Sequence, residues 1–278
     1  MRAILRRLGI AAGLALAAGM ATELWGRTRF RRLVKSDVQS LSAASSTAGE
    51  ERFVSDAMLD GLPEPVQRYL RYAGIVGKPF VRKVHLRQKG RMLLARGTPW
   101  IPLTAEQWYS IRPPGFVWYA TLNIGPVPIL RARDMYRTGE GRMLIKAASL
   151  FTVADAKGQE FDQGEMVRYL SEMIWFPSAF LEDNISFEEV DARSARVIFT
   201  DGGRTATGTF FFDAEGRLTE FVARRYAGTK LETWSVSIAG YGRFEGLNLP
   251  VRGKPQWKLA EGDQEYIDLT ITELSHES

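Results

Sequence analysis

Four charged residues near the middle of the chain are the side chains most capable of chemistry: Asp134, Lys146, Glu165 and Arg168. Two carboxylic acids in one site could divide the roles of general acid and general base, provided that burial separates their pKa values. Asp134 and Lys146 could equally face each other across a hairpin as a salt bridge. Because charged clusters are more often structural than catalytic, a carboxylate-based enzyme is the alternative hypothesis here.

Other kinds of reactive site find little support in the sequence. It contains no cysteine, which excludes disulfides, thiolate catalysis and Cys-ligated metal sites. The two histidines, His85 and His276, have no second histidine or carboxylate at ligand spacing. The Gly-rich residues 202–208 lack the lysine of a phosphate loop and are typical of a hairpin turn. We therefore predict no metal and no cofactor.

Aromatic side chains are the more informative signal, because they recur along the predicted strands and one helix. On the concave face of a curved sheet they could line a hydrophobic pocket. They could equally be core, since large side chains dominate the packing of any β-rich domain. The candidate ligand-binding residues are Trp118, Tyr136, Tyr169, Met173, Trp175, Phe176 and Trp234.

Several of these candidates lie in residues 162–177, DQGEMVRYLSEMIWFP, which are predicted to form a helix. Asp162 as N-cap and Glu165 three residues later form a variant of the capping box, which gives both acids a structural role. At 100° per residue, Glu165, Arg168 and Glu172 share one polar arc, with ion pairs at helical spacing. The last turn is apolar on nearly every side, which is typical of a buried helix end.

The surrounding periodicity predicts an α+β fold. Residues 62–74 show an amphipathic helix pattern bounded by proline and glycine. Segments within residues 79–153 and 195–274 predict about ten or eleven strands, and their short links require antiparallel pairing. Such a sheet must cover its apolar face. We predict a large curved antiparallel sheet, a half-barrel, wrapped around two helices.

The N-terminus differs from the rest in charge and hydropathy. Residues 1–35 carry a net charge of +7 and the rest of the chain carries −2, which gives the total of +5. The folded part is therefore close to neutral, and a nucleic-acid partner is not expected. Residues 8–25 predict a hydrophobic helix that attaches the chain to a membrane. We divide the chain into a membrane segment with basic flanks (1–35), a Ser- and Ala-rich tether (36–61) and a single β-rich domain (62–278).

Five phrases together resemble an uncharacterised bacterial family, known only as a domain of unknown function. They are LPEPVQRYLRYAG, AEQWYSIRPPGFVWYA, RARDMYRTGEGRMLIK, DQGEMVRYLSEMIWFPSAFL and GYGRFEGLNLPVRGKPQWKL. The resemblance extends from about residue 60 to the C-terminus and implies one domain, but no activity and no catalytic residue. The layout is also distantly similar to LolA/LolB-like lipoprotein carriers, in which a half-barrel encloses a hydrophobic cavity covered by helices.

Three functions remain open at this point. The leading hypothesis is a membrane-tethered, non-catalytic domain that binds a hydrophobic ligand such as a lipid or acyl chain. The alternatives are a carboxylate-based enzyme acting near the membrane and a structural or partner-binding module. The carrier-like layout suggests an extracytoplasmic domain, whereas the basic flank at residues 27–35 suggests a cytoplasmic one. The sequence predicts no oligomeric state.

Overall fold

The computed structural model describes residues 2–45 and 51–278, and it describes side chains from residue 19 onward. The helices are α1 (Arg2–Ala44), α2 (Glu64–Ala73) and α3 (Gln159–Glu172), with short 3-10 helices η1 (Asp56–Leu59), η2 (Met173–Trp175) and η3 (Pro177–Leu181). The strands are β1 (Lys83–Met92), β2 (Ile101–Ser110), β3 (Gly115–Ile124), β4 (Val127–Arg137), β5 (Glu140–Ala147), β6 (Phe151–Lys157), β7 (Ile185–Asp191), β8 (Ser194–Asp201), β9 (Arg204–Phe212), β10 (Leu218–Ala227), β11 (Lys230–Ile238), β12 (Tyr241–Phe244), β13 (Leu247–Pro250), β14 (Arg252–Leu259), β15 (Gly262–Glu265) and β16 (Ile267–Glu277).

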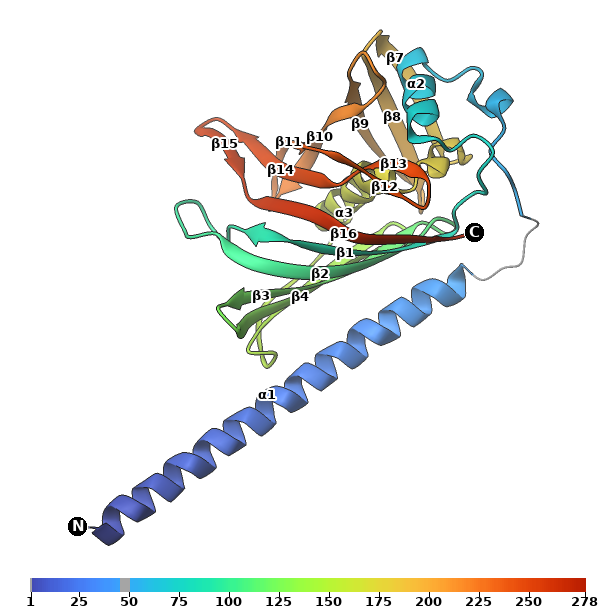
Figure 1. The fold of residues 1–278 in the computed structure, drawn as a ribbon. Coiled ribbons are helices and arrows are strands. Elements are labelled where there is room, and N and C mark those ends of the chain that lie inside the picture. The colour runs from blue at the N-terminus through green and yellow to red at the C-terminus, as the bar shows by residue number, and fades with distance from the viewer. Residues whose placement is uncertain (1, 46–50) are drawn as a thin grey trace.

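Fourteen strands form one curved antiparallel sheet, which confirms the predicted α+β half-barrel (Figure 1). The order is β6-β5-β4-β3-β2-β1-β16-β14-β11-β10-β9-β8-β7, with β15 paired to β14, while β12 and β13 form a separate hairpin. The first six strands are sequential neighbours, and β1 joins them to the C-terminal half by pairing with β16. Helix α3 lies in the connection between the two edge strands β6 and β7. It crosses the concave face of the sheet, where it contacts β4, β5, β6, β9 and β10.

The sheet has more strands than the ten or eleven predicted, for local reasons. Residues 141–153, which the sequence predicts as one strand, divide into β5 and β6 where Ala148 and Ser149 turn the chain at φ angles of 44° and 60°. Most side chains of β7 are exposed, so it lacks the alternation that marks a half-buried strand. β13 and β15 have four residues each, too few for a pattern.

Helix α2 forms as its sequence predicts. Pro65 lies in the first turn, and Gly74 ends the helix in the left-handed conformation at φ 79°. Its apolar face, including Val66 and Tyr69, is fully buried in the main core. The Tyr69 hydroxyl donates to the backbone oxygen of Ile174 over 3.2 Å, which links α2 to η2.

Helix α3 begins one turn earlier than predicted, and the capping-box interpretation of Asp162 is wrong. The helix starts at Gln159 after Gly158, whose φ of 112° favours glycine. Asp162 instead lies within the first turns, where its carboxylate accepts the Gly141 amide over 2.8 Å and pairs with Arg204 over 2.5 Å. It therefore ties α3 to two strands of the sheet and does not cap the helix.

Helix α1 packs on the outer, convex face of β2 and β3 (Figure 1). Phe30, Val34 and Leu41 are buried there against Val117 and Leu144 in a second, smaller core. These positions recur at helical spacing, so one stripe of α1 faces the sheet. The C-terminal half of α1 is thus part of the folded unit.

Two arginines on the outer face of β4 fix α1 by ion pairs. Arg131 lies 2.8 Å from Glu23, and Arg133 lies 3.5 Å from Asp37. Both guanidinium groups are buried beneath the helix. Burial lowers the pKa of Arg133 and raises the pKa of Asp37. Removal of either carboxylate would leave a buried guanidinium group without compensation.

The predicted membrane segment lies mostly beyond the described side chains. Residues 8–18 of the apolar run belong to α1, but their side chains are outside the described residues. No helix in the described part of the chain is both long and apolar enough to span a membrane. Attachment through residues 8–25 therefore stays a prediction.

The segment predicted as a tether, residues 36–61, has three parts. Residues 36–44 complete α1, and residues 46–50 lie outside the described residues. Residues 51–61 contact the domain: Val54 is buried and its backbone amide donates to Lys78 over 2.8 Å. Residues 51–61 therefore pack against the sheet domain, and Val54 belongs to its core.

Candidate functional site

A cavity of about 910 Å³ lies between α3 and the concave face of the sheet. Strands β1, β3 to β6, β10, β11, β13, β14 and β16 contribute to its wall. Most of the wall is apolar, and its larger members are Met92, Leu94, Phe161, Trp118, Trp175, Trp234 and Trp257. A volume of this size is within the range of small-molecule and cofactor sites.

Arg168 is the centre of a charged cluster on one wall of the cavity. Its Nη1 atom donates to Asp134 Oδ2 over 2.6 Å, and its Nε atom donates to Glu172 Oε1 over 2.9 Å. The guanidinium carbon lies 4.8 Å from the ring centre of Phe116 and 5.0 Å from that of Trp118. Ion pairs and aromatic stacking together hold this cation in the interior.

Arg225 on β10 extends the cluster. Its Nη2 atom donates to Glu165 Oε1 over 2.8 Å, and its Nε atom donates to the Gly164 backbone oxygen over 2.9 Å. The guanidinium lies over the rings of Trp234 at 4.8 Å and Trp257 at 5.9 Å. Arg168 and Arg225 are therefore both paired with acids and stacked on indole rings.

Two carboxylate oxygens in the cluster have no hydrogen-bond partner among the described residues: Asp134 Oδ1 and Glu165 Oε2. Asp134 is 5% exposed and Glu165 is 1% exposed. Burial raises the pKa of Asp134, while Arg168 opposes the rise. Burial and then the neighbouring Asp134 raise the pKa of Glu165 to about 8. A protonated Glu165 can donate to Asp134, so that two adjacent carboxyls share one proton.

The predicted polar set is mostly brought together by the fold. Asp134, Glu165 and Arg168 converge in the wall of the cavity. Lys146 is elsewhere, with its Nζ atom donating to the Leu150 backbone oxygen over 3.2 Å within the β5–β6 hairpin. The possible salt bridge between Asp134 and Lys146 does not form, because the strand register places Asp134 opposite Met143.

The predicted aromatic set divides between the cavity and the solid core. Trp118, Trp175 and Trp234 line the cavity. The other four pack in the main core: Tyr136, Tyr169, Met173 and Phe176. The core tyrosines also have internal partners, since Tyr136 donates to Asp201 over 2.6 Å and Tyr169 donates to the Ser110 backbone oxygen over 3.0 Å.

Three residues that line the cavity were not among the predicted site residues: Arg225, Trp257 and Glu172. Arg225 lies in a predicted strand, where nothing local distinguishes it from a surface residue. Trp257 is one of the aromatic residues that recur along the predicted strands, but it was not chosen as a candidate ligand-binding residue. Glu172 was placed in a polar arc of α3, yet it accepts hydrogen bonds from Gln107 over 2.8 Å and Tyr109 over 2.9 Å. A signal for Arg225 and Glu172 would have required their partners in the fold, which lie 60 to 65 positions away in the chain.

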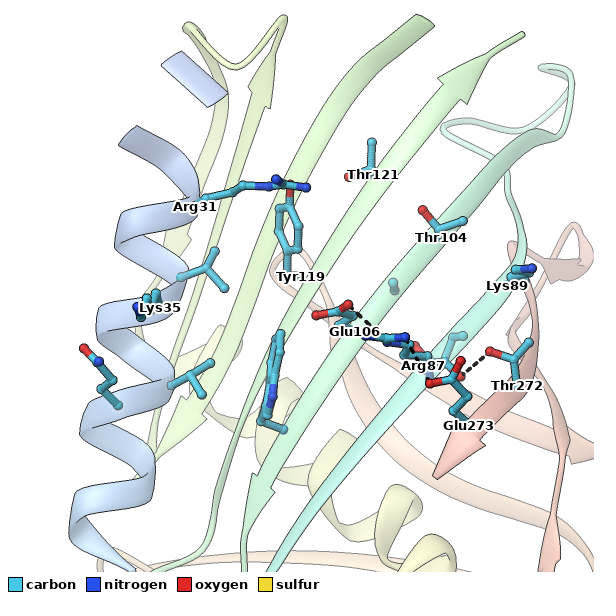
Figure 2. Close-up of a pocket in the computed structure, with 16 residues that line it drawn as sticks. Arg31, Lys35, Arg87, Lys89, Thr104, Glu106, Tyr119, Thr121, Thr272 and Glu273 are labelled. Carbon is cyan, nitrogen blue, oxygen red and sulfur yellow. Dashed lines mark hydrogen bonds and ion pairs between the residues drawn. The ribbon is translucent and has the colours of Figure 1, made fainter. Parts of the chain in front are cut away.

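A second depression, of about 900 Å³, lies between α1 and the outer face of β1 to β3 and β16 (Figure 2). Arg31 and Lys35 reach it from α1. On its floor Arg87 pairs with Glu106 over 3.3 Å and with Glu273 over 3.0 Å. These floor side chains are exposed to solvent, so this groove gives a ligand less burial than the concave cavity. No group of three or more acidic or histidine residues in the described part of the chain is arranged to hold a metal ion.

Comparison with known proteins identifies a family but no activity. No curated protein sequence matches the chain. A domain assigned as an outer membrane lipoprotein-sorting protein from Vibrio parahaemolyticus has 10% identity and a TM-score of 0.39, covering 71% of this chain and 86% of that chain. A LolA superfamily protein from Nitrosomonas europaea has 9% identity and a TM-score of 0.43, covering 77% of this chain and 94% of that chain. The sequence profile of a family of unknown function, DUF6544, matches residues 52–269, and the chain belongs to that family.

Proposed function

We propose that the domain binds a hydrophobic ligand, such as a lipid or an acyl chain, in the cavity between α3 and the sheet. The observation that carries this proposal is the size of the cavity together with its tryptophan-rich wall. Transfer of a chain from water to such a wall is favourable by roughly 0.8 kcal/mol per methylene group. The binding function needs no catalytic residue.

The hydrogen bonding of the wall favours an apolar ligand. The indole N–H groups of the three predicted tryptophans are already used inside the protein: Trp118 donates to Gln88 over 2.8 Å, Trp175 to the Pro250 backbone oxygen over 3.0 Å, and Trp234 to Tyr266 over 3.0 Å. These rings therefore present carbon surface to the cavity. Such surface stabilises a ligand by burial and not by polar contacts.

Membrane attachment through residues 8–25 remains part of the proposal, because a membrane would supply a lipid ligand directly. A reporter fused to the C-terminus distinguishes an extracytoplasmic from a cytoplasmic domain. The basic flank at residues 27–35 favours the cytoplasmic side. An extracytoplasmic reporter signal would support the carrier-like alternative.

Binding can be tested with the purified full chain. Lipid extraction followed by mass spectrometry should recover a hydrophobic molecule, and a fluorescent hydrophobic probe should bind with saturation. The variant Leu269→Trp adds bulk inside the cavity and should reduce probe binding strongly, because Leu269 belongs to its wall. Val190→Trp, at an exposed position on β7, is the matched control. Equal binding by the wild type and Leu269→Trp would exclude this cavity.

A carboxylate-based enzyme is the second candidate, favoured by the convergence of Asp134, Glu165 and Arg168. A carboxyl group with a pKa near 8 suits acid–base chemistry at neutral pH. Its unpaired oxygen is buried away from the cavity surface, which is a poor position for contact with a substrate. The test is incubation with a bacterial lipid extract: an enzyme would convert a component, and Glu165→Gln would abolish conversion without abolishing binding.

A further inference from the structure

We infer that the ligand is electrically neutral and carries an uncharged oxygen that accepts a hydrogen bond from Tyr266. This inference rests on the proposed function and names the chemical class of the ligand: an apolar molecule with an alcohol, ester or ketone group. Two independent features of the cavity lead to it. One is the charge balance of the buried cluster, and the other is the hydrogen bonding of Tyr266.

The buried cluster contains two arginines and three carboxyl groups. Arg168 contacts Asp134, Glu172 and, at 3.8 Å, Glu165, while Arg225 contacts Glu165. With all three carboxyls ionised, the cluster has one net negative charge. With one proton shared between Asp134 and Glu165, it is neutral and its unpaired oxygens gain a partner. The neutral state is the one that a low-dielectric interior favours.

The other charged residues of the wall do not provide a free buried charge. Arg252 donates to both carboxylate oxygens of Asp268 over 2.7 Å. Lys157 and Glu160 are exposed to solvent at the ends of β6 and α3. Solvent and salt screen charges at such exposed positions. In the described part of the chain, every arginine that lines the cavity thus has a carboxylate partner.

A charged ligand group would disturb this balance in either direction. An anion beside the cluster would need a second proton or would remain uncompensated. A cation would have to displace the shared proton from Asp134 and Glu165. Burial of an uncompensated charge costs far more than burial of a hydrogen-bonded neutral group. The cluster therefore selects against charge at the polar end of the ligand.

Tyr266 supplies a hydrogen-bond donor for a neutral group. Its hydroxyl oxygen accepts from Trp234 Nε1 over 3.0 Å and from Arg225 Nη1 over 3.4 Å. Neither donor can accept a hydrogen bond in return, and none of the described residues accepts the hydroxyl proton of Tyr266. The Tyr266 ring lines the cavity and stacks on Trp257 with a centroid distance of 6.2 Å. Its hydroxyl proton is thus available to a ligand oxygen.

The experiment measures how well decanol, decanoate and decylamine displace N-phenyl-1-naphthylamine from the full chain. These competitors share one chain length and differ in charge. Below the pKa of Glu165 we expect decanol to displace the probe at a concentration at least about ten-fold lower than either charged competitor, because the charged groups lack compensation. Displacement by none of the three would contradict the proposed function itself.

Two variants separate the two features. Tyr266→Phe should weaken decanol about five-fold, the effect of one lost hydrogen bond, while binding of the oxygen-free probe stays unchanged and reports on folding. Tyr119→Phe, on the outer face of the sheet, is the control. Glu165 faces Asp134 of β4, Arg225 of β10 and Arg168 of α3, and its ionisation above about pH 8 gives the cluster a net negative charge. The affinity for decylamine relative to that for decanol should therefore increase as the pH rises, and Glu165→Gln should abolish that increase.

The outcomes of these experiments test the inferred ligand chemistry separately from the proposed binding of a hydrophobic ligand. Tighter binding of decanoate or decylamine than of decanol below the pKa of Glu165 would overturn neutrality and leave a hydrophobic site in place. An unchanged affinity of Tyr266→Phe for decanol would overturn the assigned hydrogen bond. The ratio of the affinities for decylamine and decanol could also change with pH equally in the wild type and in Glu165→Gln. That result would show that the shared proton is not involved.

Discussion

The Arg168 guanidinium donates to the Asp134 carboxylate over 2.6 Å and so fixes the middle of α3 to β4. The same arginine holds Glu172, whose other oxygen accepts from Gln107 and Tyr109 of β2. One guanidinium therefore connects the crossing helix to two strands of the concave face. The charged wall of the cavity therefore also holds α3 against β2 and β4.

Arg168→Met should destabilise the fold by roughly 3–5 kcal/mol, because it leaves buried carboxylates without their cation. The measurement is the urea midpoint of the full chain at neutral pH. Arg71→Met is the control, since the Arg71–Asp56 pair is exposed. A loss no greater than that of the control would show that the cluster does not contribute to stability.

Glu165→Gln should change the pH dependence of stability in a defined direction. The pKa of Glu165 rises from its ordinary value of 4.5 to about 8 in the folded chain. Between these values the unfolded chain releases the proton while the folded chain keeps it, so the wild type loses stability as the pH rises. Glutamine has no such proton. Urea midpoints at neutral pH and above about pH 8 should therefore fall less in the variant than in the wild type.

Gly141→Ala should destabilise the contact between β5 and α3. A Cβ atom at residue 141 would lie 2.9 Å from Glu165 Cγ, closer than real packing allows. We expect a loss of roughly 1–3 kcal/mol, measured by chemical denaturation. Gly253→Ala is the control, because its Cβ atom would lie at an ordinary 3.5 Å from Val236. Equal stabilities for the two variants would show that α3 can move away from β5 freely.

Asp37→Ala should loosen α1 without affecting the cavity. The substitution leaves Arg133 buried beneath the helix without its carboxylate. Hydrogen exchange of residues 23–44 should accelerate, whereas binding of the hydrophobic probe should not change, because α1 lies on the convex face. Asp56→Ala, which removes an exposed carboxylate, should leave both readouts unchanged. A loss of probe binding in Asp37→Ala would mean that α1 supports the concave face through the sheet.

The fold could be predicted because strand alternation and short links determine an antiparallel sheet, and such a sheet needs a covered face. The convergence of Asp134, Glu165 and Arg168 could be predicted in part, because Glu165 and Arg168 lie one helical turn apart. A helical wheel, however, gives the faces of a helix and not which face is buried. The polar arc of α3 faces the cavity, because the helix crosses the concave side of the sheet and is covered on both flanks.

Other parts of the site depend on contacts that no local pattern carries. Arg225 reaches Glu165 over a separation of 60 residues, and Tyr266 meets Trp234 over 32. Lys146 has the charge needed to pair with Asp134 and lies in the same β4–β5 hairpin, but the strand register places Met143 opposite Asp134. Asp162 had the right residue type for an N-cap, but the helix begins one turn before it. Only tertiary packing decides each of these cases.

The pairing of β1 with β16 has a consequence for how the chain reaches its native state. Lys83 and Glu277 pair across a separation of 194 residues, at the centre of the sheet. During synthesis the edge of β1 therefore stays unpaired until β16, almost 200 residues later in the chain, has left the ribosome. Unpaired strand edges promote association between chains, and distant pairings slow folding. The pairing of β1 with β16 at the centre of the sheet is thus a place where a nascent chain exposes an unpaired strand edge until its partner strand is made.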